Sequence, residues 1–313
     1  MRITKVRVAA ALACSLILLV TMCSALRNNA EPVVNTSPAA RSSAEGASKV
    51  SAAESPVTDA PSTVVATGSA ESPRSLHQQL MSARDLRVLY LDFLQQGDAG
   101  GGLYAMNILM RCSSVRQRHF PANWMPQTVE QGKAKAFTEA QCASFLESEL
   151  SMDAVAALAR DPRLKSDQLR SLLDTWVRKS QTSEERNSAL SAVLQTRDPL
   201  LLEQLAGAVF SIGGKIAFDG RVYNEPYALP ILSSAWISAM CDGLQTQCGE
   251  IGDPYLMEAC INQNACFSNR YQLFASDADS RFGKEAGTLF RTIYPKIVEA
   301  IRSQDVAAFN FQR

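Results

Sequence analysis

Residues 167–179 read DQLRSLLDTWVRK, and this stretch carries the pattern that decides the fold of the chain. Its apolar residues recur three and four positions apart: Leu169, Leu172, Leu173, Trp176 and Val177. Such spacing places the apolar side chains on one stripe of an otherwise polar α-helix. The same period dominates residues 76–313. We therefore predict an all-α fold for this part of the chain, built as an irregular array of helical hairpins stapled by disulfides.

Capping residues mark the starts of these helices. Three Asp-Pro pairs put a capping oxygen before a proline that suits the first helical turn: Asp161-Pro162, Asp198-Pro199 and Asp253-Pro254. Thr138 and Gln141 form a capping box, and Ser166 and Ser183 supply further caps. The pattern predicts about ten helices, near residues 76–96, 102–117, 138–159, 166–179, 184–195, 199–212, 227–242, 254–263, 267–275 and 284–303.

A single strand signal interrupts the helical pattern. In KIAFDGRVY, residues 215–223, alternating apolar residues both precede and follow Asp219-Gly220. This pair is typical of tight hairpin turns. Two interpretations follow, a small hairpin or an ordered loop between helices. We favour the loop.

The N-terminal residues 1–27 predict a signal peptide or signal anchor. They read MRITKVRVAAALACSLILLVTMCSALR, with a basic start followed by an uncharged stretch at residues 8–26. Three outcomes stay open: cleavage after Ala25, an uncleaved inner-membrane anchor, or lipidation at Cys23, where Met22 departs from the lipobox pattern. Each outcome exports the remainder, and we expect a periplasmic protein, tethered to the inner membrane if the segment stays uncleaved.

Residues 28–75 predict a disordered linker. They are rich in Ala, Ser, Pro and Thr and contain no Leu, Ile, Met, Cys or aromatic residue. Such a segment cannot bury enough apolar surface to offset the entropy of ordering the chain. The folded, exported domain is therefore expected to span residues 76–313.

The cysteines of this domain predict a disulfide framework, because an even number of cysteines in an exported chain favours pairing. They are Cys112, Cys142, Cys241, Cys248, Cys260 and Cys266. A zinc site is disfavoured, since no pair has the two-residue spacing and the only histidines are His77 and His119. Positions at helix ends, with Gly243 as a C-cap, favour local pairing: Cys112–Cys142, Cys241–Cys248 and Cys260–Cys266. The alternative crosses the last two pairs, as Cys241–Cys260 and Cys248–Cys266.

Charge and motifs disfavour several classes of ligand. The 31 basic and 31 acidic side chains give a formal net charge of zero, so we expect no nucleic-acid partner. The glycines of residues 97–102 and 213–214 lack the ending of a phosphate-binding loop. Asp277 and Asp279 open like a calcium loop, but Arg281 breaks its acidic pattern. We expect neither a cofactor nor a metal.

Glu147 is the candidate catalytic residue. In an exported helical domain, the pair Glu147-Ser148 resembles lytic transglycosylases, in which a glutamic acid of raised pKa protonates the glycosidic oxygen. The residues at 151–153, Ser-Met-Asp, depart from the Gly-Leu-Met-Gln segment of that family. The competing interpretation places Glu147 and Glu149 on a solvated face, opposite Phe145 and Leu150.

Two longer segments, residues 85–112 and 236–309, resemble a loose group of uncharacterised exported helical proteins of Gram-negative bacteria. The matching positions are Trp236, Cys241, Gly243, Cys248, Cys260 and Cys266. The glycine that the group carries between its second cysteine pair is missing here, where residues 262–264 read Asn-Gln-Asn. The resemblance implies an all-α fold and periplasmic exposure, and it implies no activity.

These features favour a non-enzymatic interaction or envelope-structural module displayed on a membrane tether. Its expected partner is an envelope protein or a cell-wall component, with the membrane contacted through the N-terminal segment if that stays uncleaved. The alternative is a cell-wall-active enzyme of the lytic-transglycosylase kind, or an inhibitor of such an enzyme.

Overall fold

The computed structural model describes most of the expected domain. The described residues are 75–117, 125–179, 182–212, 214–246, 248, 252–263 and 265–309. They belong to one compact unit, Gly68–Arg313. The predictions for residues 1–27 and for all of the linker before Ser75 lie outside the described residues.

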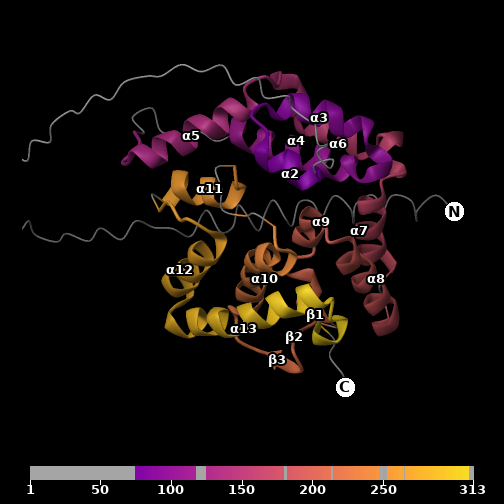
Figure 1. The fold of residues 1–313 in the computed structure, drawn as a ribbon, viewed down its shortest axis with the longest axis vertical. Coiled ribbons are helices and arrows are strands. Elements are labelled where there is room, and N and C mark those ends of the chain that lie inside the picture. Colours follow the sequence, from indigo (N-terminus) through magenta and orange to yellow (C-terminus); the bar gives the residue numbers. More distant parts are fainter. Residues whose placement is uncertain are drawn as a thin grey trace, which may run out of the picture. The chain divides into compact units, whose positions relative to one another are not determined.

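The first part of the described chain packs around α4. Its elements are α2 (Leu76–Ser82), α3 (Leu86–Gln95), η1 (Gly97–Ala99), α4 (Gly101–Gln117), α5 (Val129–Cys142), η2 (Glu147–Leu150) and α6 (Met152–Ala159), where η denotes a 3-10 helix. Helices α2, α3, α5 and α6 all contact α4. They are the indigo and magenta ribbons of Figure 1.

The middle part forms a helical hairpin followed by shorter elements. They are η3 (Pro162–Lys165), α7 (Gln168–Lys179), α8 (Ser183–Thr196), α9 (Pro199–Gln204) and η4 (Ala208–Phe210). Helix α7 packs against α8 and also contacts α4, so the hairpin joins the first group of helices. The helix predicted at 166–179 is confirmed, with Leu169 and Trp176 buried, but Val177 of the predicted apolar stripe is exposed.

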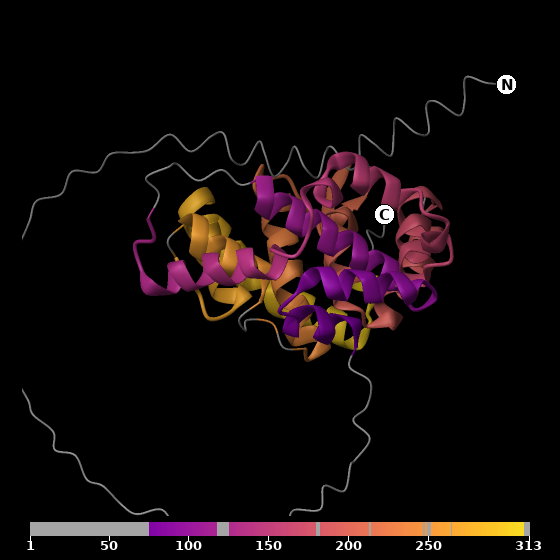
Figure 2. The same ribbon diagram turned by 90° about the horizontal axis from the view of Figure 1, so that it is seen from above.

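The last part is built around the pair α10 and α13. Its elements are β1 (Ser211–Ile212), β2 (Lys215–Phe218), β3 (Arg221–Tyr223), α10 (Ala228–Leu244), α11 (Pro254–Gln263), α12 (Arg270–Phe282), α13 (Lys284–Ser303) and η5 (Val306–Phe309). Helix α10 contacts α9, α12 and α13, and α11 contacts α5 of the first group. Figure 2 shows the same arrangement turned by 90°.

Aromatic side chains fill the centre of the last part. Phe210, Phe218, Trp236 and Phe309 are each at most 1% exposed. Their ring centroids lie 5.3–6.0 Å apart in tilted and edge-to-face pairs, the geometry that aromatic rings prefer. The indole N–H of Trp236 donates to the carbonyl of Leu202 at 2.7 Å, so its one polar atom is satisfied. This cluster fixes α10 against the sheet and η5.

The chain is predominantly helical, with twelve α-helices among the described residues. The helices at 254–263 and 284–303 match the prediction, but residues 215–223 do not form the loop we favoured. They form the antiparallel hairpin β2–β3, which β1 extends to a three-stranded sheet in the order β1-β2-β3. Asp219 and Gly220 have φ of 52° and 70°, the left-handed pair that a tight hairpin turn needs.

Two predicted helices are each divided into separate elements in the structure. The single helix expected at 76–96 is two helices, because the Asp85 carboxylate accepts from the N–H groups of Arg87 and Val88 and starts α3. The helix expected at 138–159 is also wrong. Thr138 lies inside α5, where its hydroxyl donates to the carbonyl of Ala134, and the chain turns before η2 and α6.

Boundaries of four further helices differ. The residues that cap α7 and α8 are Asp167 and Thr182 rather than the neighbouring serines. The helix expected at 199–212 ends at Gln204, because Gly207 adopts a φ of 84° and the chain enters η4 and β1. Helix α12 starts at Arg270, capped by Asn269, and extends past the predicted end.

The cysteines pair locally, as predicted. The sulfur atoms lie at disulfide distance in three pairs: Cys112–Cys142, Cys241–Cys248 and Cys260–Cys266. The first bridge ties α4 to the last residue of α5, which ends there rather than beginning a helix. Three disulfides indicate that the domain resides in an oxidising compartment. Within the described ranges, no helix is both long enough and apolar enough to cross a membrane.

Candidate functional site

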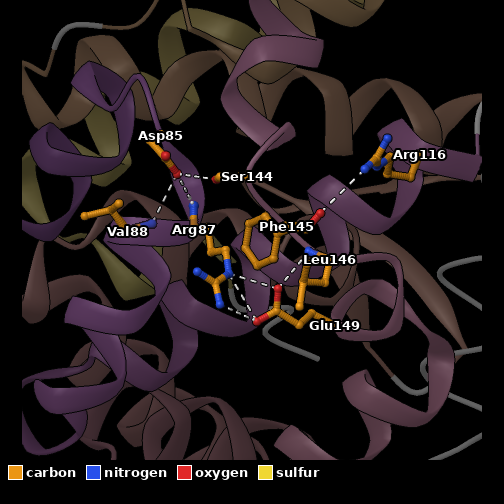
Figure 3. A network of polar contacts seen from close by, with 8 residues as sticks. All are labelled: Asp85, Arg87, Val88, Arg116, Ser144, Phe145, Leu146 and Glu149. Atoms are coloured by element: carbon orange, nitrogen blue, oxygen red, sulfur yellow. Dashed lines mark hydrogen bonds and ion pairs between the residues drawn. The ribbon is translucent and has the colours of Figure 1, made fainter.

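Glu147, the carboxylate singled out from the sequence, lies exposed at the first position of η2. The nearby Glu149 is the carboxylate that makes hydrogen bonds within the fold. Glu149 accepts from Nε and Nη2 of Arg87 at 2.9–3.1 Å and from the N–H of Leu146 at 2.8 Å (Figure 3). Hydrogen bonding to Arg87 lowers the pKa of Glu149. A general acid needs the opposite shift, so Glu149 is a structural group.

The contacts around Glu149 hold the turn between α5 and η2 against α3. The Ser144 hydroxyl donates to the Asp85 carboxylate at 2.6 Å, and Arg116 of α4 donates to the Phe145 carbonyl at 3.5 Å. Figure 3 shows these side chains converging on the turn. Phe145 is buried below them, and its ring lies 5.7 Å from that of Tyr90. This network explains how the turn is held and offers no reactive group.

His77, one of the two histidines, is buried in α2 with a 5% exposed surface. In the described structure neither ring nitrogen meets a hydrogen-bond partner. Burial and the nearby Arg270 guanidinium together lower the pKa of His77 to about 4, although the Asp253 carboxylate acts the other way. His119 lies outside the described residues. Among those described, no three His, Cys, Asp or Glu residues gather closely enough to hold a metal ion.

Arg270 lies near His77, at the centre of a buried charged cluster. Its guanidinium donates to Asp253 at 2.7 Å and lies 3.7 Å from the Glu203 carboxylate. It also stacks on the Tyr255 ring, 4.7 Å from the ring centroid. Burial alone would lower the pKa of Arg270, but the carboxylates of Glu203 and Asp253 outweigh it and the pKa is raised. The cluster joins α9, α11 and α12, and the Arg270 guanidinium pairs with both of its carboxylates.

Burial raises the pKa of several carboxyl groups, the shift that a catalytic acid needs. They are Asp167, Asp198, Glu203 and Asp277. Each has a structural partner. Asp167 accepts from backbone N–H groups at the start of α7, Asp198 accepts from the Tyr104 hydroxyl, and Asp277 pairs with Arg281. Glu203 belongs to the Arg270 cluster. The raised pKa values therefore arise within the packed fold.

An open groove lies where the C-terminal end of α10 meets α13. We call it the α10–α13 groove; it encloses about 500 Å³, and its lining residues are Cys241, Asp242, Gln245, Thr246, Tyr294, Pro295, Val298, Glu299 and Arg302. Five of them, Asp242, Gln245, Pro295, Glu299 and Arg302, are exposed. The groove is thus a solvent-facing recess with a polar rim, of the size of a small-ligand site.

Contacts within the groove position its side chains. The Tyr294 hydroxyl donates to the Asp242 carboxylate across the two helices. Glu299 and Arg302 pair at 3.3 Å along α13. Burial and the Asp242 carboxylate raise the pKa of Tyr294, so the hydroxyl stays protonated and remains a donor at neutral pH. The bridge between Cys241 and Cys248 closes the chain back onto the end of α10. The walls are therefore pre-formed.

Sequence reasoning did not find the groove. One signal was present: Tyr294, Val298 and Arg302 follow one another at four-residue spacing and so share a face of α13. That face also carries the buried residues that pack on α10. The four-residue spacing alone therefore predicts a helix face that packs in the core. The partner side chains on α10 are adjacent only after folding.

Comparison with known proteins gives no relative from which to transfer a function: no family model, curated protein or solved structure matches the chain. The fold and the groove therefore define this protein by its architecture alone. It is a predominantly helical domain, cross-linked by disulfides, with an open polar groove.

Proposed function

We propose that this protein is an exported, non-enzymatic binding module of the cell envelope, and that the α10–α13 groove is its ligand-binding surface. The proposal places the domain in the periplasm, held by the N-terminal segment at residues 1–27. It also keeps the chain with the exported helical proteins that its cysteine pattern resembles. The disulfides support export, because such bridges persist in oxidising compartments.

The observation that carries the proposal is the construction of the groove. Its two walls are helices packed directly on each other, and a disulfide fixes the chain at one end. Rigid walls lose little conformational entropy when a ligand binds, and they present the exposed side chains in one arrangement. Asp242, Gln245 and Arg302 supply hydrogen-bonding groups of three chemical types. This arrangement suits recognition.

The enzymatic alternative needs a carboxyl group of raised pKa inside a cleft. Glu147 is exposed and does not line the groove. The carboxyl groups whose pKa burial raises also lie outside the groove lining, each with a structural partner. These placements favour binding over catalysis. An inhibitor of a cell-wall enzyme would itself be a binding module, and the experiment below would identify the enzyme as its partner.

Export is tested by fusing a reporter that is active only in the periplasm after residue 75 and at the C-terminus. Both fusions should be active. Cytosolic activity at either point would remove the compartment on which the proposal rests.

Binding is tested by co-purification from detergent-solubilised envelopes under oxidising conditions, with a matched pair of variants. Gln245 and Gln304 both end a helix in the left-handed conformation, with φ of 56° and 57°, and of the two only Gln245 lines the groove. Glycine suits this conformation at both positions. We expect Gln245→Gly to lose an envelope component that the wild type and Gln304→Gly retain. Equal recovery by all three would refute the groove as the binding surface.

A further inference from the structure

The chemistry of the α10–α13 groove narrows the class of ligand that it would take. Its aromatic surface is provided by Tyr294, whose ring lies 4.7 Å from the ring of Tyr271 on α12. Tyr271 is 36% exposed, so the aromatic surface continues beyond the groove. Aromatic rings at a wet surface offer an apolar face beside a polar hydroxyl. A ligand that is apolar on one face and polar at its edges fits this surface.

The polar groups of the groove are planar donors and acceptors held close to that ring. Asp242 supplies carboxylate oxygens, Gln245 an amide, and Arg302 a guanidinium. Planar groups of this kind bind pairs of neighbouring hydroxyl groups with two hydrogen bonds. Thr246 adds a hydroxyl that can both donate and accept.

Charge disfavours anionic ligands. The lining contains two carboxylates, Asp242 and Glu299, against the single guanidinium of Arg302. That guanidinium already pairs with Glu299. A phosphate or a polyanion prefers clustered arginine and lysine, and the net negative groove would repel it.

An extended peptide also fits poorly. Peptide recognition commonly uses an exposed strand edge or an apolar groove. The described sheet is formed by residues 211–223, and none of its strands lines the groove. The groove is open and polar at its rim, so it lacks the deep apolar pockets that anchor peptide side chains.

We propose that the α10–α13 groove binds an uncharged glycan chain, with a sugar ring lying on Tyr294 and its hydroxyl or acetamido groups bound by Asp242, Gln245 and Arg302. The inference rests on the proposed function and names the ligand class of the same groove. A pyranose has an apolar face of C–H groups and an equatorial rim of hydroxyls, which matches a tyrosine ring flanked by planar polar groups.

The test is calorimetric titration of the purified full chain, kept in a detergent without sugar headgroups. Two probes distinguish the source of the glycan: a soluble oligomer of N-acetylglucosamine, as in cell-wall strands, and a neutral glucose oligomer. We expect saturable binding of at least one probe. Tyr294→Leu should weaken it at least tenfold, whereas Tyr294→Phe, which keeps the ring, should weaken it only a few-fold.

Gln245→Gly provides a second variant, should Tyr294→Leu fail to fold. It should weaken sugar binding several-fold, and Gln304→Gly should leave it unchanged. Failure of both probes to bind, or equal binding by Gln245→Gly and the wild type, would overturn the glycan assignment. If co-purification still depends on Gln245 in that case, the proposed binding module stands and only its ligand class is wrong. If neither assay depends on Gln245, both proposals fail.

Discussion

Gly243 of α10 lies directly against Ile301 of α13. A methyl group at position 243 would come within 2.8 Å of Ile301 Cβ and Cγ2 and within 3.2 Å of the Val298 carbonyl oxygen. Gly243 was expected to end its helix, but it lies buried inside α10, and Gln245 is the C-cap. Because Val298 and the adjacent Asp242 line the groove, this close approach sets the distance between the groove walls.

Gly243→Ala should therefore force α10 and α13 apart. We expect the free energy of unfolding to fall by about 1–3 kcal/mol, the usual cost of overpacking, and envelope binding to weaken. Urea denaturation measures the first effect. The control is Gly132→Ala in α5, where the nearest atoms lie at 3.4 Å, an ordinary contact; replacing this helical glycine should raise stability by about 0.5–1 kcal/mol. A Gly243→Ala protein as stable as the wild type would contradict the close packing.

Arg270→Met should be among the most damaging single substitutions. It removes the guanidinium that pairs with the buried carboxylates of Asp253 and Glu203, and we expect a loss of about 3–5 kcal/mol in the free energy of unfolding. Arg87→Met is the matched control, since it removes a partly exposed arginine from its pair with Glu149. That change should cost far less than the loss of Arg270, because solvent screens the pair. Similar losses for the two variants would show that the buried cluster is not coupled as described.

His77 should make the stability depend on pH. Its folded-state pKa of about 4 lies below the ordinary value of 6.5, so folding favours the neutral ring. The stabilisation is complete above pH 6.5 and is lost as the pH falls toward about 4, by up to roughly 3 kcal/mol. His77→Leu removes this loss. The difference between wild type and variant isolates His77, because His119 and the carboxylates are common to both. Parallel pH profiles between pH 4 and 6.5 would refute the prediction.

The disulfides should differ in their contribution to stability. The loop-entropy model gives roughly 3.7 kcal/mol for the Cys112–Cys142 bridge and about 2.5 kcal/mol for Cys241–Cys248. Paired alanine variants, compared by denaturation, should follow this order. Mass spectrometry of a non-reduced digest checks the pairing itself. A peptide that links Cys241 to Cys260 would contradict the local scheme.

The helices were predictable where capping and periodicity agree. At 254–263 the Asp253 carboxylate, just before Pro254, accepts from the N–H of Tyr255 in the first helical turn, and the predicted bounds match the structure. Prediction failed where a side chain makes a local hydrogen bond other than the expected one. Asp85 begins a new helix inside a continuous apolar pattern, and Thr138 bonds within its helix instead of capping it. Both residues have two locally reasonable hydrogen-bonding arrangements, and tertiary packing selects one.

The groove was not predictable, for a different reason. Tyr294 and Asp242 meet only because α10 and α13 pack together, and neither residue belongs to a motif that reports that pairing. The Arg270 cluster was not predictable for the same reason, since its carboxylates come from α9 and the start of α11. Cysteine pairing was easier to predict, because each cysteine pairs with its neighbour along the chain, two of the bridges at separations of only 7 and 6 residues.

The central claim, that the groove contacts an envelope component, is tested most directly by photocross-linking in living cells. A photoreactive amino acid would be placed at Gln245 in one strain and at Gln304 in another, both at helix ends with the same backbone conformation. We expect an adduct of higher mass from position 245 and none from position 304. No adduct from position 245, or the same adduct from both positions, would contradict it.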